Sequence, residues 1–341
     1  MTRAGACKTY AANALCIAAV HQMKTAKFKM VNKKCTNQST DLLKATRINA
    51  IVVRGWVKMA VCDMHLHTTA SDGTDTPEEM MKRVRDAGIR TFALTDHDTI
   101  DGAMELAPKV PGDMTFYRGI EFSCLAKNGK VHILGYNYNP ENAVFRDALA
   151  FGERQRHRKL DIRIAYLEEK FGIHFSNEEL EKLHAIPRPG KPHLADLLVR
   201  KGYAANITEA IKKYLNGCRS GISRIGAETA VKAILSAGGI PVWAHPLGGE
   251  GEAELPRETF EKTLDELMDY GIQGLECWYS RYTEEQVDFL LAAAKMHGLL
   301  ISGGSDCHGT RKTIAAGTLN AFGAEVGEEQ LTILTELAKR K

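Results

Sequence analysis

Short apolar runs alternate with amphipathic, helix-like segments along the chain from Val61 onward. Apolar runs of four or five residues between turn signals are typical of buried strands. The expected strands cover residues 61–65, 91–95, 115–119, 131–135, 240–244, 274–278 and 299–302. Strands that alternate with helices in this way predict an α/β protein built on a parallel sheet or barrel.

The helical segments carry sequence signals at both ends. The first begins after a cap at Thr76, with a proline and two acids in its first turn, and it stops before Gly88. Three further helices, expected at 228–237, 258–270 and 284–297, also stop at a glycine that is followed at once by an apolar run. A helix that stops at a glycine and is followed at once by a strand is typical of proteins built from repeated βα units.

Residues 143–225 interrupt the alternation between the fourth and the fifth expected strand. This stretch is charged and mostly helical in pattern. Its helices are expected at 153–171, 177–184, 193–201 and 208–216, and the last helix of the chain is expected at 327–339. We therefore predict a barrel formed by residues 59–142 and 226–341, with residues 143–225 inserted as a helical subdomain.

Residues 1–58 differ in composition from the rest of the chain. They hold eleven lysines and arginines but a single acid, Asp41, whereas the remainder holds more acids than bases. We interpret them as a disordered leader that precedes the true start at Met59; a weak targeting-peptide outline around residues 11–20 is the alternative. The mildly acidic remainder argues against a DNA-binding face.

The cysteines and the hydropathy pattern indicate the cellular setting. The eight cysteines are scattered and form no Cys-x-x-Cys pair. This usage fits reduced thiols in a cytoplasmic protein better than a disulfide framework. No run of 18 apolar residues occurs, so we expect no membrane-spanning helix.

Histidines and acids gather where the expected strands end. Residues i and i+2 at a strand end point to the same side, so both imidazoles of a His-x-His pair can face one ion. Histidine and carboxylate ligands together suit zinc, manganese or iron. The candidate ligands are His65, His67, Asp72, His97, Glu121, His132, His245, Asp306 and His308. A single histidine of this kind is more often a packing residue, but so large a set at one barrel rim points to metal binding.

Nine donors exceed what one ion needs, since a tetrahedral zinc uses about four ligands. We therefore expect two or three divalent ions, with manganese preferred and iron or zinc as alternatives. Cys307 lies between two of these donors. Because side chains alternate along an extended segment, its thiol is expected to point away from the ions and into the core.

Five motifs resemble the metal-binding motifs of the polymerase and histidinol phosphatase (PHP) family. They are Asp63-Met-His65-Leu-His67 with Asp72, Thr95-Asp96-His97-Asp98, Gly119-Ile-Glu121, Ala244-His245-Pro246 and Ser305-Asp306-Cys-His308. The resemblance covers the chain from about Val61 to its end. It implies a distorted seven-stranded (β/α) barrel with a trinuclear metal site.

The same resemblance implies how the ligands divide among the ions. One ion would be held by His65, His67, Glu121 and Asp306. Glu121 would bridge to a second ion, which His132 and His245 would also bind. The third ion would be held by Asp72, His97 and His308.

The helical insertion is similar to that of one PHP branch. Members of this branch remove the 3′-phosphate of nucleoside 3′,5′-bisphosphates, and some act as 5′-to-3′ exoribonucleases on short RNA. Lys191-Pro-His193 resembles the Arg-Pro-His element of that branch. Lysine lacks the planar bidentate phosphate contact of arginine, and Arg188 is the candidate that replaces it. The expected substrate contacts are thus Lys191, His193, Arg188 and Ser280.

These features predict a metal-dependent phosphoesterase. The ions would bind phosphate oxygens and lower the pKa of a bridging water, so that hydroxide attacks phosphorus. The residues on which catalysis is expected to depend are His65, His67, Glu121, Asp306 and His308. The expected partners are a small nucleotide substrate or short RNA. No association with a membrane is expected.

Three other functions remain open. The first is a simple phosphomonoesterase such as histidinol-phosphate phosphatase. The second is a non-catalytic PHP module, which the complete ligand set disfavours. The third is an amidohydrolase, which lacks support because no strand ends in a candidate carboxylated lysine.

Overall fold

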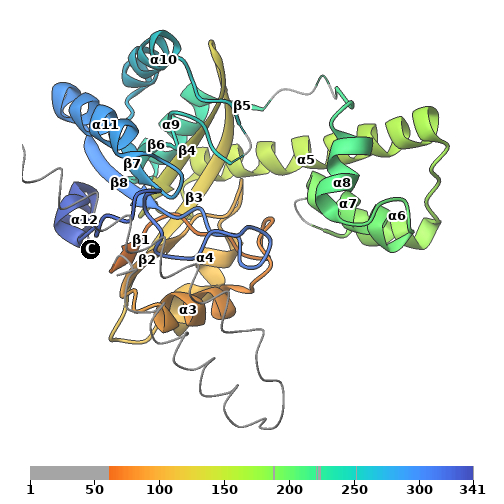
Figure 1. Ribbon diagram of the computed structural model, residues 1–341, viewed down its shortest axis with the longest axis horizontal. Coiled ribbons are helices and arrows are strands. Elements are labelled where there is room, and N and C mark those ends of the chain that lie inside the picture. The colour runs from red at the N-terminus through yellow and green to blue at the C-terminus, as the bar shows by residue number, and fades with distance from the viewer. Residues whose placement is uncertain (1–60, 187–188, 220, 222–223, 251, 341) are drawn as a thin grey trace, which may run out of the picture. The chain divides into compact units, whose positions relative to one another are not determined.

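The computed structural model describes residues 61–186, 189–219, 221, 224–250 and 252–340 (Figure 1). The expected leader, residues 1–58, and the candidate substrate residue Arg188 lie outside these residues. The strands are β1 (Cys62–Asp63), β2 (Thr91–Leu94), β3 (Thr115–Ala126), β4 (Gly129–Tyr136), β5 (Ile225–Gly226), β6 (Ile240–Ala244), β7 (Gly274–Tyr279) and β8 (Leu300–Gly304). All seven expected strands are therefore present, and β5 is an additional short one.

Seven strands form a nearly closed barrel in the order β1-β2-β3-β4-β6-β7-β8, and β5 pairs with the side of β3. The barrel closes where β8 meets β1, since the Met64 amide donates to the Gly303 carbonyl over 3.1 Å. A side chain at Gly304 would lie 2.6 Å from the His65 backbone nitrogen. Gly304 thus allows the close approach that closes the barrel.

The barrel is mixed, which corrects the expectation of uniformly parallel strands. β4 runs antiparallel to both β3 and β6, while the other neighbours on the path are parallel. β3 continues past Gly119 to Ala126 and forms a hairpin with β4. Glu121 therefore lies inside a long strand, and His132 stands opposite Ser123 in the middle of the hairpin.

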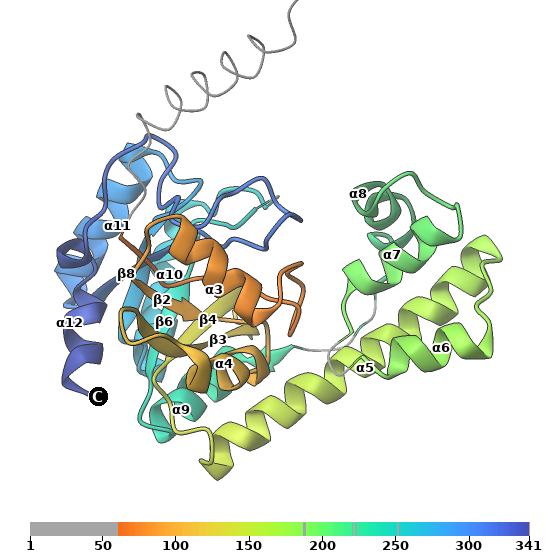
Figure 2. The ribbon, with the colours of Figure 1, turned by 90° about the horizontal axis from the view of Figure 1, so that it is seen from below.

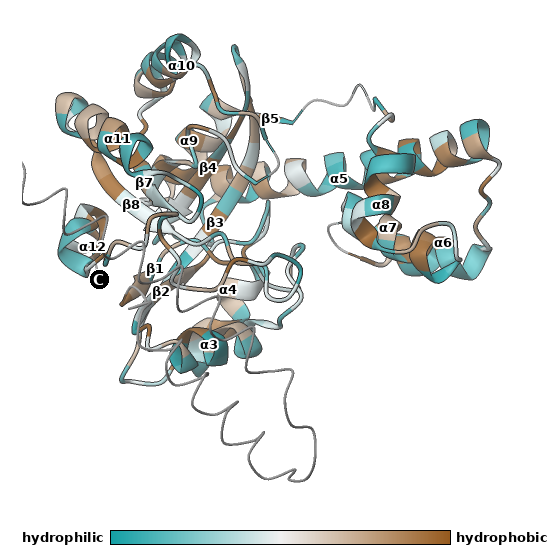
Figure 3. Cartoon of the chain, in the orientation of Figure 1, coloured by the Kyte–Doolittle hydropathy of each residue, from teal (hydrophilic) through white to brown (hydrophobic). Residues whose placement is uncertain are grey.

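Helices cover the barrel on its outside (Figures 1 and 2). They are α3 (Pro77–Asp86), α4 (Asp101–Leu106), α9 (Ala227–Ser236), α10 (Arg257–Tyr270), α11 (Glu284–His297) and α12 (Thr332–Lys339), with short 3-10 turns at Ala107–Lys109 and Glu328–Gln330. The expected cap of the first helix at Thr76 is confirmed: its hydroxyl accepts from the Glu79 amide, and the Glu79 side chain completes a capping box. Figure 3 shows apolar strands and helices that alternate between apolar and polar residues, as amphipathic cover requires.

The insertion consists of α5 (Ala143–Phe171), α6 (Asn177–His184), α7 (Lys191–Arg200), α8 (Ile207–Ala210) and a π-helical turn (Ile211–Leu215). α5 starts ten residues before the expected position because Asn142 caps it by accepting from the Phe145 amide. Phe145 packs in the barrel core, whereas Leu160 and Leu167 belong to a separate apolar cluster with α6 and α7. α5 thus connects the two cores.

Candidate metal centre and adjoining cavity

Backbone pairing brings the loops after β1, β2 and β8 to one place. Leu66 forms a parallel bridge with Cys307, and His97 forms one with Glu121. These bridges position His65, His67, Asp306 and His308 beside the β3–β4 hairpin. Buried carboxyl groups inside the barrel mouth support the arrangement: Asp63 accepts from Ser305, and Asp96 accepts from Thr68 and Ser71.

Glu121 is the hub of the site. Its Oε1 lies 2.8 Å from His132 Nδ1 and 3.0 Å from His245 Nε2. Its Oε2 lies 2.9 Å from His97 Nδ1, 3.2 Å from His67 Nε2 and 3.3 Å from His65 Nε2. One buried carboxylate therefore faces five imidazoles, the arrangement expected of a bridging ligand.

Asp306 and His308 complete the cluster. Asp306 Oδ1 lies 3.1 Å from His67 Nε2, and its Oδ2 accepts from the Tyr279 hydroxyl and from Lys312 Nζ. His308 Nε2 lies 3.3 Å from Asp72 Oδ1. All nine expected ligands thus lie in one connected group of side chains.

The electrostatics of the cluster favour anionic carboxylates. Burial opposes ionisation of Glu121, but the surrounding imidazoles hold its pKa well below the usual range. Burial also opposes ionisation of Asp306, whose pKa Lys312 holds well below the usual range. Burial lowers the pKa of His132 to about 4, whereas Asp306 and Glu121 outweigh burial at His67 and raise its pKa to about 9. Glu121 and Asp306 are therefore anionic at neutral pH, as carboxylate ligands of a cation must be.

Three sets of donor atoms lie close enough together to hold an ion, each within 4.8 Å. The sets are His67, Asp72, His97 and His308; His65, His67 and Glu121; and His97, Glu121 and His132. His67 Nδ1 is buried and makes no hydrogen bond within the described residues. His97 Nδ1 and Glu121 Oε2 are also buried, and they lie 2.9 Å apart without forming a hydrogen bond. Such buried polar atoms need a partner, and a divalent cation suits this donor chemistry. The division of ligands among individual ions stays a prediction.

Glu276 on β7 belongs to the site but was not among the site residues predicted from the sequence. This fully buried carboxylate accepts from His65 Nδ1 over 2.8 Å and from the His245 amide over 2.7 Å. A proton on His65 Nδ1 leaves Nε2 free to face the centre, which is how carboxylates orient metal-binding histidines. A lone glutamate in an otherwise apolar strand was the available signal.

Backbone strain accompanies the site. Asp98, His245 and Asp306 have positive φ angles of 54°, 29° and 56°. Such angles are uncommon outside glycine and cluster at functional sites.

Cys307, which follows Asp306, is buried, and burial raises the pKa of its thiol to about 11. A neutral thiol in the apolar core agrees with the expectation that it is not a nucleophile.

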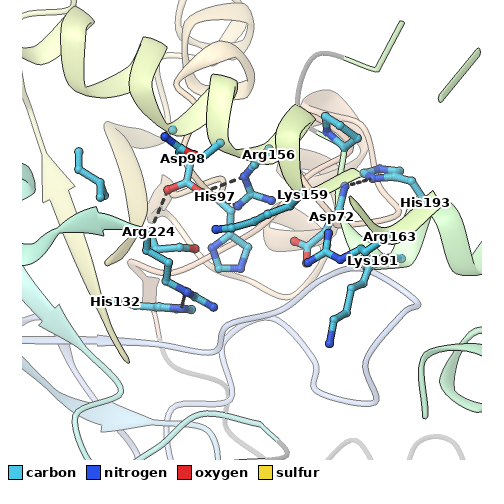
Figure 4. A pocket seen from close by; sticks show the side chains of 17 residues that line it. Asp72, His97, Asp98, His132, Arg156, Lys159, Arg163, Lys191, His193 and Arg224 are labelled. Atoms are coloured by element: carbon cyan, nitrogen blue, oxygen red, sulfur yellow. Dashed lines mark hydrogen bonds and ion pairs between the residues drawn. The ribbon is translucent and has the colours of Figure 1, made fainter. Parts of the chain in front are cut away.

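A cavity of about 280 Å³ opens beside the cluster, between the barrel mouth and the insertion (Figure 4). Asp72, His97 and His132 line it from the barrel side. Most of the remaining charged side chains are cationic. They are Arg156, Lys159 and Arg163 from α5, Lys191 from α7, and Arg224. His193 of α7, whose pKa burial lowers, also lines the cavity. We call this cavity the basic cavity.

The basic residues of α5 were missed because they resemble an ordinary solvated helix face. Arg156, Lys159 and Arg163 are spaced three and seven residues apart, which places them on one side of the helix. Gly152 on the same side leaves room for the Asp98 loop, since a side chain there would lie 3.3 Å from Asp98 Cβ. Arg156 Nε donates to Asp98 over 2.8 Å and so orients α5 on the barrel mouth.

Two of the four expected substrate residues line the basic cavity. Lys191 Nζ donates to Asn216, and burial lowers its pKa. His193 Nδ1 accepts from the Gly190 amide over 2.9 Å, so the ring proton lies on Nε2. Ser280 does not line this cavity, although its hydroxyl is buried and unpaired among the described residues.

Among the described residues, no helix is both long and apolar enough to cross a bilayer.

Known proteins are similar to this chain in sequence and in fold. A model of the PHP domain matches residues 63–215. A 5′-3′ exoribonuclease of Haemophilus influenzae is 31% identical over 251 residues, which cover 72% of this chain and 89% of that protein. A 3′,5′-nucleoside bisphosphate phosphatase of Chromobacterium violaceum is 30% identical over 258 residues, which cover 73% and 88%. A solved structure described as a metal-dependent phosphoesterase, from Bifidobacterium adolescentis, is 28% identical with a TM-score of 0.67 over 82% of this chain and 96% of that one.

Proposed function

Since this chain belongs to the PHP family of metal-dependent phosphoesterases, we propose that it removes the 3′-phosphate of nucleoside 3′,5′-bisphosphates and shortens 5′-phosphorylated RNA. The observation that carries this proposal is the basic cavity beside the metal centre. A monoester needs one phosphate site, whereas a bisphosphate needs a second, cationic one. The similarity to an exoribonuclease and a bisphosphate phosphatase supports the same substrate class.

We propose that two or three divalent ions, manganese before iron or zinc, bind the cluster. The proposed ligands are His65, His67, Asp72, His97, Glu121, His132, His245, Asp306 and His308. The mixed imidazole and carboxylate donors and the unpaired buried Nδ1 of His67 support this assignment. When bound, the ions neutralise phosphate charge and lower the pKa of water so that hydroxide forms near neutral pH.

The chain's own residues position the substrate. Lys159, Arg163 and Lys191 face the basic cavity and can neutralise the non-reacting 5′-phosphate, and His193 Nε2 can donate to it. Holding this remote group fixes the scissile phosphate at the centre. In the reaction, a bond forms between the water oxygen and phosphorus, the bond from phosphorus to O3′ breaks, and O3′ takes up a proton.

Other parts of the proposal concern residues outside the basic cavity. Arg188 and Ser280 stay candidates for further substrate contacts. The described cysteines Cys62, Cys124, Cys218, Cys277 and Cys307 are free thiols, which supports a reducing, cytoplasmic location.

Two assays in the presence of manganese test the function: inorganic phosphate release from the phosphate monoesters, and mononucleotide release from the oligonucleotide. The substrates are adenosine 3′,5′-bisphosphate, histidinol phosphate and a 5′-phosphorylated trinucleotide. We expect kcat/KM for the bisphosphate to exceed that for histidinol phosphate by at least about tenfold, because only the bisphosphate fills the basic cavity. Equal or higher efficiency with histidinol phosphate would establish a simple phosphomonoesterase instead.

A further inference from the structure

A second cavity reaches the metal centre from the β4–β6 side. It has a volume of about 320 Å³, and both His132 and His245 line it. His132 also lines the basic cavity. A phosphate held at the centre would therefore adjoin two separate cavities, which we distinguish by calling this one the β4–β6 cavity.

The β4–β6 cavity differs in chemistry from the basic cavity. Val131, Pro246, Ala253 and Leu255 give it mainly apolar walls. Its one carboxylate, that of Glu252, accepts from the Gly249 amide over 3.2 Å and so belongs to the loop that forms the wall. Apolar walls with few charges suit a base or sugar better than a phosphate.

Lys130 is the one cation of this cavity within the described residues. Its side chain makes no hydrogen bond or ion pair to any other described residue. It stands two residues before His132 on β4, so both side chains point to the same face of the strand. Lys130 therefore lies about 7 Å along the strand from a candidate metal ligand, a separation on the order of one nucleotide step.

We propose that the β4–β6 cavity binds the nucleotide on the 3′ side of the scissile phosphate, with Lys130 as the counter-ion of the phosphate that follows it. This inference rests on the proposed function. The bisphosphatase and exoribonuclease reactions break the same bond, between phosphorus and O3′. They differ only in the group that stays on phosphorus, which is an oxygen in one case and the 5′-oxygen of the next nucleotide in the other.

This difference makes the β4–β6 cavity specific for RNA cleavage. A bisphosphate has nothing to place there, since inorganic phosphate is released. A 5′-phosphorylated oligonucleotide places its second nucleotide there, and this nucleotide departs with a new 5′-phosphate. The basic cavity serves both substrates, whereas the β4–β6 cavity contributes only to the second.

The test compares the manganese-loaded enzyme and its variants on adenosine 3′,5′-bisphosphate and on a 5′-phosphorylated triribonucleotide. Lys130→Ala should lower kcat/KM for the trinucleotide at least about fivefold further than for the bisphosphate, because one charge contact is lost. Lys130→Arg should restore most of the loss. Ala253→Trp places a large side chain in the cavity at an exposed position. It should also lower kcat/KM for the trinucleotide more than for the bisphosphate.

Lys127→Ala is the matched control, because Lys127 lies on the same hairpin, is exposed and uses only its backbone amide, which donates to Glu266. Equal losses on both substrates in the Lys130 and Ala253 variants, or no loss in either, would overturn the subsite. A wild-type enzyme that hydrolyses the bisphosphate but not the trinucleotide would overturn it too. A wild-type enzyme that cleaves only the trinucleotide would contradict the proposed bisphosphatase function. The subsite would then be supported if Lys130→Ala and Ala253→Trp, but not Lys127→Ala, lowered kcat/KM for the trinucleotide, and overturned if they did not.

Discussion

At the scale of single residues, the centre depends on a few buried carboxylates. Glu121 faces five imidazoles, and Asp306 is held by Tyr279 and Lys312. Buried charges of this kind are costly unless each has a partner. A cluster with unpaired donor atoms is therefore better explained by cation binding than by a contribution to the stability of the fold.

Glu276 should control metal affinity without binding the metal. In Glu276→Gln, the amide cannot accept from both His65 Nδ1 and the His245 amide as the carboxylate does. We expect manganese affinity to fall by about ten- to hundredfold, as for other groups that orient metal-binding histidines. Isothermal titration calorimetry measures it, with Glu258→Gln on the surface of α10 as the control. Unchanged affinity would show that Glu276 only packs β7.

Lys159 should give substrate binding a dependence on pH. Burial and repulsion from Arg224 and Arg156 lower its pKa to about 8. Its ammonium group is therefore charged below pH 8 and becomes neutral above it. We expect KM for the bisphosphate to rise up to about fivefold between pH 7 and pH 9 as this charge is lost.

Lys159→Arg keeps the charge throughout this pH range and should flatten the profile of KM against pH. Lys232→Arg, at an exposed position on α9, is the control and should retain the wild-type profile. If the profiles of Lys159→Arg and wild type coincide, Lys159 does not bind the phosphate.

At the scale of elements, local signals located most helices and strands. β6, α6 and α11 match their expected bounds, and α3 has the expected cap at Thr76. Caps, glycine stops and apolar runs act within a few residues, so they can be recognised in a single sequence. The metal motifs could be recognised for the same reason, because each lies within a short stretch of sequence.

The errors arose where pairing between distant segments decides the structure. Gly119 resembles a strand end, but β4 pairs with β3 beyond it and extends it to Ala126. The basic face of α5 resembles a solvated surface until the barrel mouth is placed opposite it. Glu276 stood out locally only as a lone glutamate in an apolar strand, and its role depends on His65 and His245, which come from other strands.

The N-terminus of α7 should contribute to substrate binding through His193. His193→Ala removes the Nε2–H donor that faces the basic cavity, so we expect KM for the bisphosphate to rise about tenfold. KM for a simple monoester should change less than about twofold, because a monoester lacks the second phosphate. His184→Ala on the exposed face of α6 is the control. A parallel rise in KM for both substrates would exclude His193 from the phosphate site.

At the scale of the whole molecule, a closed barrel brings together donors that are up to 243 residues apart, from His65 to His308. The seal between β8 and β1 and the bridges after β1 and β2 hold these loops in one mouth. The insertion adds the cationic wall that a plain barrel would lack. The candidate metal ligands and the cationic wall thus come from two different parts of the chain.

Metal analysis of the folded protein tests the central claim most directly. After incubation with manganese and removal of free metal, we predict two or three ions per wild-type chain by inductively coupled plasma mass spectrometry. Glu121→Ala should bind at least one ion fewer and lose at least about a hundredfold in phosphatase activity, with an unchanged circular dichroism spectrum. Folded wild-type protein that stays metal-free with manganese, iron and zinc, or a fully active Glu121→Ala variant, would contradict the account.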